Sequence, residues 1–227
     1  MPSDFPLSPR LLKGALLVYE SQSPGPPPKV IVFQYNPDQL SRSLATRAAP
    51  REPSNVGGAR EAVLRVLGPP VETVNLAVEL DAADQLEEPQ QNQSAVENGL
   101  HPALATLELL LYPPTARVRE VERLLAQEGQ VQICPADLPL TLLVWGKSRV
   151  VPILLTSFSV TEQAFDQVLN PIQARVDLGI RVLTYMEFQP TSVGHDAYLS
   201  YQRQKETLAG QYQPGGPESA ISGLLPF

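Results

Sequence analysis

The sequence has few of the side chains that carry most catalytic and metal chemistry. Its 227 residues include one cysteine, Cys134, and two histidines, His101 and His195. A lone cysteine excludes an intramolecular disulfide and most thiolate metal sites. Both histidines stand at the starts of expected helices, where polar residues serve as caps, so we interpret both as structural. Because there is no glycine-rich phosphate loop, nucleophile elbow or paired His or Cys motif, we expect no enzyme activity, no cofactor and no metal.

Long apolar runs are also missing. No stretch approaches the roughly 20 apolar residues that a membrane-spanning helix needs. The N-terminus lacks the basic region and apolar core of a signal peptide. A net charge of −7 and a pI near 4.9 weigh against a nucleic-acid partner. We therefore expect a soluble cytoplasmic protein without direct membrane insertion, whose assembled particle is released or membrane-anchored.

Charge of each sign is concentrated in one part of the chain. Residues 41–69 are rich in arginine, whereas every charged residue from 79 to 97 is acidic. The arginines are Arg42, Arg47, Arg51, Arg60 and Arg65, against Glu52 and Glu61, and the acidic residues are Glu79, Asp81, Asp84, Glu87, Glu88 and Glu97. Two interpretations are open: complementary patches across a head-to-tail contact between identical subunits, or two solvated loops.

What the sequence does contain is a long hairpin pattern from Leu140 to Tyr185. Strands are expected at Leu140–Trp145 and Val150–Val160, and a third follows the break at Asn170-Pro171. In the third, apolar and polar residues alternate, which indicates one buried and one solvated face. The apolar set is Val176, Leu178, Ile180 and Val182, and the polar set is Arg175, Asp177, Gly179 and Arg181.

The whole chain predicts a mainly β (α+β) fold. The 24 prolines and short turns favour about six or seven antiparallel strands, closed as a barrel or sandwich because exposed edges need cover. We expect a β domain over residues 1–190, with inserted loops at 41–70 and 81–100 and helices within 101–127. The acidic segment is expected to be a mobile loop. A helix and tail over 191–227 would complete the chain.

Several short blocks resemble one known family. They begin with Phe33-Gln34-Tyr35-Asn36-Pro37, Leu40 and Ser41-Arg42, and the whole resemblance spans roughly Leu11 to Gln202. The later blocks are Glu72-Thr73-Val74, Glu79-Leu80-Asp81, Leu107 to Pro114, Leu140 to Gly146, Leu155 to Glu162, Phe165-Asp166, Leu169-Asn170-Pro171 and Ala174-Arg175-Val176. Their order and spacing resemble the tube-type proteins of contractile injection systems, which are phage-tail-like baseplate and tube-initiator components.

The resemblance implies a tail-tube-like β-barrel or sandwich that assembles as a homo-hexameric ring. Its partners would be tube, spike or hub, and baseplate wedge proteins. The arginine and aspartate face of the hairpin would line a lumen or an inter-ring surface. The residues expected at subunit contacts are Phe33, Tyr35, Arg42, Arg47, Trp145, Phe158, Arg175 and Arg181.

One departure from the family and two alternatives bear on function. Many relatives carry a C-terminal LysM-type module, but this chain ends at Phe227 after a helix and a Pro/Gly tail, so we do not predict glycan binding. The alternative to a ring subunit is a monomeric β-barrel module that binds a small apolar ligand in an unfilled interior. A hydrolase is disfavoured, since no nucleophile and base stand together in the sequence.

Overall fold

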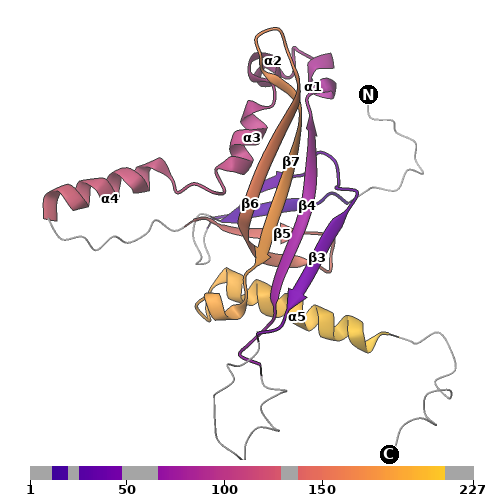
Figure 1. Cartoon of the computed structure of the whole chain (residues 1–227), viewed down its shortest axis with the longest axis vertical. Coiled ribbons are helices and arrows are strands. Elements are labelled where there is room, and N and C mark those ends of the chain that lie inside the picture. The colour runs from indigo at the N-terminus through magenta and orange to yellow at the C-terminus, as the bar shows by residue number, and fades with distance from the viewer. Residues whose placement is uncertain (1–11, 20–25, 48–65, 129–137, 213–227) are drawn as a thin grey trace, which may run out of the picture.

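The computed structural model describes residues 12–19, 26–47, 66–128 and 138–212. The fold is mainly β, as the sequence predicts. Seven strands form one antiparallel sheet in the order β2-β1-β5-β6-β7-β4-β3 (Figure 1). Their bounds are Ala15–Tyr19 (β1), Lys29–Val32 (β2), Leu40–Ala45 (β3), Val71–Asp81 (β4), Leu140–Val144 (β5), Val150–Phe165 (β6) and Pro171–Val182 (β7).

The alternation predicted for β7 is confirmed. Val176, Leu178 and Ile180 are each at most 2% exposed, while Arg175 and Asp177 of the alternating set are exposed and Gly179 is buried. Strand β6 is longer than expected and continues beyond Val160 to Phe165. It pairs with β7 along almost its whole length, from Ile153 opposite Val182 to Phe165 opposite Pro171.

The sheet bends so that its two parts face each other. Strands β1, β2 and β5 cross behind the long strands β6, β7 and β4 in Figure 1. Strand β6 belongs to both parts, because it pairs with β5 only from Val150 to Ile153. Leu16 and Leu143 of the crossing part join Val74 and Val176 of the long part in one apolar core. The described strands thus form a bent sheet with outermost strands β2 and β3.

Helices cover the remaining apolar surface and position both ends of the sheet. α3 (His101–Glu108) places Leu104 and Leu107 in the core, whereas α4 (Thr115–Glu128) projects away from the sheet (Figure 1). A short η2 (Tyr185–Glu187) leads into α5 (Val193–Gly210), which lies across the other end of the sheet. α3, α4 and α5 agree with the helices predicted within 101–127 and after residue 191. None of the described helices is both long and apolar enough to cross a bilayer.

Two predicted loops are wrong in part. The acidic segment 81–100 forms α1 (Ala83–Glu87) and α2 (Gln93–Asn98). Three small or apolar residues give it enough core contact to fold, since Ala82, Ala95 and Leu100 are buried. The expected loop 41–70 begins with residues of β3 and ends close to β4. Residues 48–65 of it, and Cys134, lie outside the described residues.

Candidate assembly interface

The first candidate, Phe33, lies inside the subunit. Its side chain is 2% exposed, and its ring centroid is 6.4 Å from that of Trp145. Gly14 allows this packing, because a Cβ there would come within 2.7 Å of Phe33 and 2.8 Å of Trp145. We therefore remove Phe33 from the set of interface residues. Trp145 is half-buried beside it and contributes mainly to the core.

The polar residues that follow Phe33 in its sequence motif, Gln34 and Asn36, join backbone segments that are far apart in the sequence. The side-chain amide of Gln34 donates to the carbonyl of Asp81 at 2.6 Å and accepts from the Asp81 N–H at 2.9 Å. The amide of Asn36 accepts from the N–H of Gly14 at 2.8 Å and donates to the carbonyl of Leu12 at 2.9 Å. Each amide thus replaces a missing backbone partner. Tyr35, between them, keeps 45% of its surface exposed and stays available to a partner.

The outer face of the long strands is polar. Cross-strand partners share a face, and the register aligns Ser41, Asn75, Gly179 and Ser157 across four strands. Next to this row lie the ion pairs of Arg175 with Glu79 at 3.9 Å and with Asp177 at 3.3 Å. Arg175 retains 48% of its side-chain surface. Neither Arg175 nor Arg181, at 30%, lies in the core.

Phe158 and Arg42 are on the opposite, inner face. Phe158 stands opposite Leu178 and packs partly against the core, so it presents only part of its ring to solvent. Arg42 stands opposite Val74 and donates to the hydroxyl of Tyr201 at 3.2 Å. Both side chains therefore have contacts inside their own subunit.

One carboxylate docks α5 onto the sheet. The side chain of Glu72 is 5% exposed and lies 3.5 Å from Arg42 and 3.1 Å from Lys205. It also accepts a hydrogen bond from the Tyr201 hydroxyl at 2.9 Å, and the ammonium of Lys205 lies 4.0 Å from the Tyr201 ring centroid. Two cations and a hydroxyl compensate this buried charge. The residues are too far apart in sequence for local patterns to reveal the cluster.

A second carboxylate, Glu187, binds Arg47 and Arg181, which are the remaining two arginines of the expected interface set. It pairs with Arg181 and lies 3.9 Å from Arg47, and it caps η2 by accepting from Thr184. Burial opposes its ionisation, but the hydrogen bonds from Thr184 and Arg181 prevail and lower the pKa of Glu187. The Nε of Arg47 is buried and has no hydrogen-bond partner.

The tip of the β6–β7 hairpin is a rigid turn with an apolar apex. Asp166 accepts from the backbone N–H groups of Val168 and Asn170, both at 2.8 Å, and from the Asn170 side chain at 2.9 Å. Desolvation opposes its charge, but these bonds prevail and lower the pKa of Asp166. Leu169 has a φ of 70°, and the side chains of Val168 and Leu169 are 74% and 76% exposed. Neither the strain nor the exposure was expected from sequence.

Two edges of the long part of the sheet lack a strand partner within the described ranges. β6 loses its partner β5 after Ile153, which leaves its outer side unpaired to Phe165. The outer side of β3 is unpaired along Leu40–Ala45. Both segments are largely exposed. Unpaired strand edges bind other strands readily.

The described residues form no evident chemical centre on the surface. Among the described residues, no three His, Cys, Asp or Glu side chains are grouped to hold a metal. One open hollow of about 860 Å³ lies between residues 34–39 and the outer face, and polar side chains such as Gln34, Glu79 and Arg175 line it. Such a hollow is unlike the mostly apolar pockets that bind small ligands.

Several residues of the resembling blocks make contacts within the subunit. Phe33 fills the core, and Gln34 and Asn36 join strand ends, so three of the five motif residues have roles within the subunit. Asp166 and Asn170, also in the resembling blocks, hold the hairpin turn. No protein-family model matches the sequence, and no curated protein does.

Proposed function

We propose that this protein is a structural subunit of a contractile injection system. Copies of it form a closed ring, sixfold in the resembling family, at the junction of the inner tube with the spike or hub. The ring also contacts baseplate wedge proteins. The resemblance of the sequence blocks supports this role, and so does the arrangement of the long strands.

The single observation behind the ring is that the four-stranded part β6-β7-β4-β3 of the sheet has no strand partner, among the described residues, along β3 or along β6 after Ile153. The order β6-β7-β4-β3 is antiparallel at every step. Because the number of strands is even, β6 of a neighbour placed beside β3 runs antiparallel to it. The same alternation then continues through every copy, and rotation closes the sheet without a mismatched pair.

The two faces of that sheet suit a wall around a water-filled channel. The inner face packs on the core through residues such as Val74, Val176 and Leu178. The outer face carries the row of mostly small polar residues that begins with Ser41 on β3 and ends with Ser157 on β6. The charged side chains next to this row are paired with one another. A closed ring with this face inward has a hydrated, weakly adhesive lining.

Proline substitutions at two neighbouring positions test the edge contact. Thr161 and Glu162 are both exposed. They lie in the part of β6 that has β7 on one side and no described strand on the other. Successive N–H groups of a strand point to opposite sides, so one of these N–H groups faces β7 and the other faces the open edge. Proline removes the N–H in each case.

We expect the two variants to behave differently. Thr161→Pro and Glu162→Pro are compared by urea unfolding and by particle mass in native mass spectrometry. One variant loses a β7 hydrogen bond and about 1 kcal/mol or more of stability. The other keeps its stability but no longer forms rings. If the variant of unchanged stability still assembles like the parent protein, the edge is not the subunit contact.

A further inference from the structure

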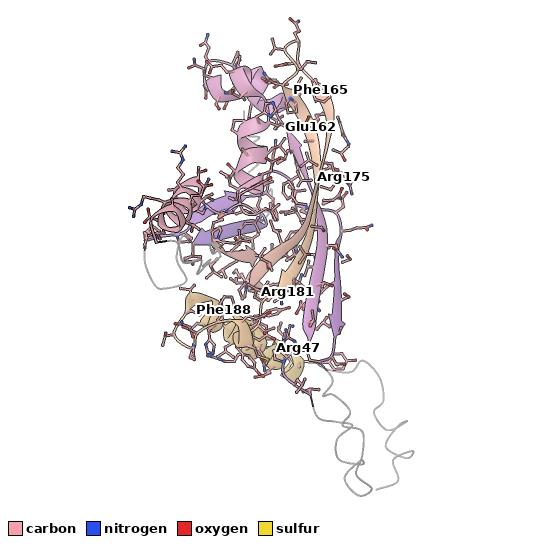
Figure 2. The ribbon with its side chains drawn as sticks, turned by 60° about the vertical axis from the view of Figure 1, so that its left-hand side comes forward. Arg47, Glu162, Phe165, Arg175, Arg181 and Phe188 are labelled. Atoms are coloured by element: carbon pink, nitrogen blue, oxygen red, sulfur yellow. The ribbon has the colours of Figure 1, made fainter. Side chains whose placement is uncertain are left out.

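One short turn holds the base of the sheet together, the base being the end across which α5 lies. This turn is η2, and Figure 2 shows Arg47 and Arg181 at the same end of the molecule. Its first residue, Tyr185, meets Tyr198 of α5 edge to face, with the ring centroids 5.9 Å apart. Its last residue, Glu187, binds Arg47 and Arg181. The turn therefore connects α5 to the ends of the long strands.

Met186, the middle residue of η2, makes a third contact. Its sulfur lies over Gly68, in a notch that exists because glycine has no side chain, and a Cβ at Gly68 would overlap that sulfur. Gly68 has a φ of 148° and follows Leu67, whose N–H donates to the carbonyl of Arg47 at 2.9 Å. Met186 thus joins η2 to the segment that leads into β4.

The same methionine is open to solvent. Met186 is 51% exposed, and Met1 is the only other methionine in the sequence. Oxidants convert an accessible methionine to its sulfoxide, which turns an apolar side chain into a polar one. Because the sulfur of Met186 is both accessible and packed over Gly68, its oxidation changes a contact inside the subunit.

From this arrangement we propose that Met186 is an oxidation site whose modification releases η2 from Gly68. The sulfur attacks one oxygen of a hydroperoxide, the O–O bond breaks, and the proton of the transferred oxygen passes to the leaving oxygen. The sulfur is oxidised to a sulfoxide, while hydrogen peroxide is reduced to water. The added oxygen makes the side chain polar and larger, so it leaves the notch and turns to solvent.

The release loosens the base of the sheet and leaves its core intact. Tyr185 precedes Met186 directly, so α5 loses part of the support that it receives through Tyr198. The buried side of β7, with Val176 and Leu178, lies within the apolar core and keeps its packing. The change takes place within one subunit, so it does not depend on ring formation.

Peptide mass mapping and amide exchange of the full chain test the site. Hydrogen peroxide, under conditions that fully oxidise N-acetylmethionine amide, should add one oxygen atom to the peptide that contains Met186. Exchange in residues 185–201 should then rise about fivefold, which corresponds to about 1 kcal/mol for the lost contact of a partly buried side chain. Exchange in β7 should stay unchanged. Methionine sulfoxide reductases A and B, one for each sulfoxide epimer, should restore the original exchange.

Two variants separate Met186 from other sites of oxidation. Met186→Leu keeps an apolar side chain of similar volume without the sulfur, so peroxide should not change its exchange, although Cys134 is still present. Met186→Gln places a polar side chain at the notch and should raise exchange in residues 185–201 without peroxide. A Met186 that stays reduced, or an oxidised Met186 with unchanged exchange, overturns the proposal. A rise in peroxide-treated Met186→Leu assigns the effect to another residue and also overturns it.

Discussion

The two ends of the sheet use carboxylates in opposite ways. At the base, Glu72 and Glu187 each bind two cations and fasten α5 and η2 to the strands. At the tip, Asp166 binds only uncharged N–H donors, and it shapes a turn that exposes Val168 and Leu169. The base carboxylates stabilise the subunit, whereas the tip carboxylate holds apolar side chains in solvent at the expense of backbone strain at Leu169.

This difference gives the subunit a direction along its strands. The unpaired edges of β6 and β3 run along the sides of the same strands, so the ends and the edges of this part of the sheet are separate surfaces. Substitutions at each end should affect stability and assembly in different proportions.

The largest stability loss is expected at the tip, from Gly99→Ala. Gly99 has a φ of 55°, and a Cβ there would lie 2.5 Å from the carbonyl oxygen of Pro171. Positive φ and a backbone clash together should cost about 3 kcal/mol and separate α2 from the hairpin. Urea unfolding measures the loss. Gly210→Ala is the control, because nothing lies within 4 Å of that site, and a comparable loss there would refute the steric explanation.

A smaller loss is expected at the base, from Glu72→Gln. The amide leaves Arg42 and Lys205 without a counter-charge and weakens the bond from Tyr201, at a cost of about 2 kcal/mol. Amide exchange in α5 should rise more than exchange in β7. Glu79→Gln, on the same strand, removes an exposed pair at 3.9 Å and should change stability by less than about 0.5 kcal/mol. Equal effects of the two substitutions would show that burial of Glu72 does not matter.

The sequence predicts the parts of this fold that depend on local pattern. The predicted alternation in β7 and the predicted helices within 101–127 and at α5 are confirmed. They could be predicted because the period of the apolar residues decides which face of an element is buried. The end of β6 was missed because Thr161, Glu162 and Gln163 are polar on both faces, and the strand continues there because it pairs with β7. Segment 81–100 was mistaken for a loop because three buried residues are enough to anchor its short helices.

The candidate interface was less predictable than the fold. Phe33 was chosen from a motif, but its role depends on Gly14 and Trp145, which only tertiary packing brings near. The Glu72 cluster joins β3, β4 and α5, and no local spacing signals such a contact. Among the described strands, β6 has an unpaired edge because β5 ends before β6 does. This depends on how the strands pair in the sheet.

The smallest expected effect concerns Tyr198 at the base. Burial, and then the negative charge of Glu72, raise the pKa of Tyr198 from 10.0 to about 12. A pKa raised in the folded state stabilises the fold below the unfolded value, and this contribution is lost as the pH rises from 10 towards 12. Ultraviolet titration of the phenolate measures the pKa. Tyr198→Phe should remove this part of the alkaline destabilisation, and a Tyr198 that titrates near pH 10 would contradict the buried environment.

The central claim is that the long strands join copies of this chain into a closed ring. Native mass spectrometry of the purified full chain tests it directly, since one subunit weighs 24.8 kDa. We predict one dominant closed multiple of that mass, sixfold by the family resemblance, which is lost in the β6 edge variant of unchanged stability. A mass of one subunit throughout a dilution series, for the protein alone and mixed with the tube and hub proteins proposed as partners, would contradict the ring and favour a monomeric binding module.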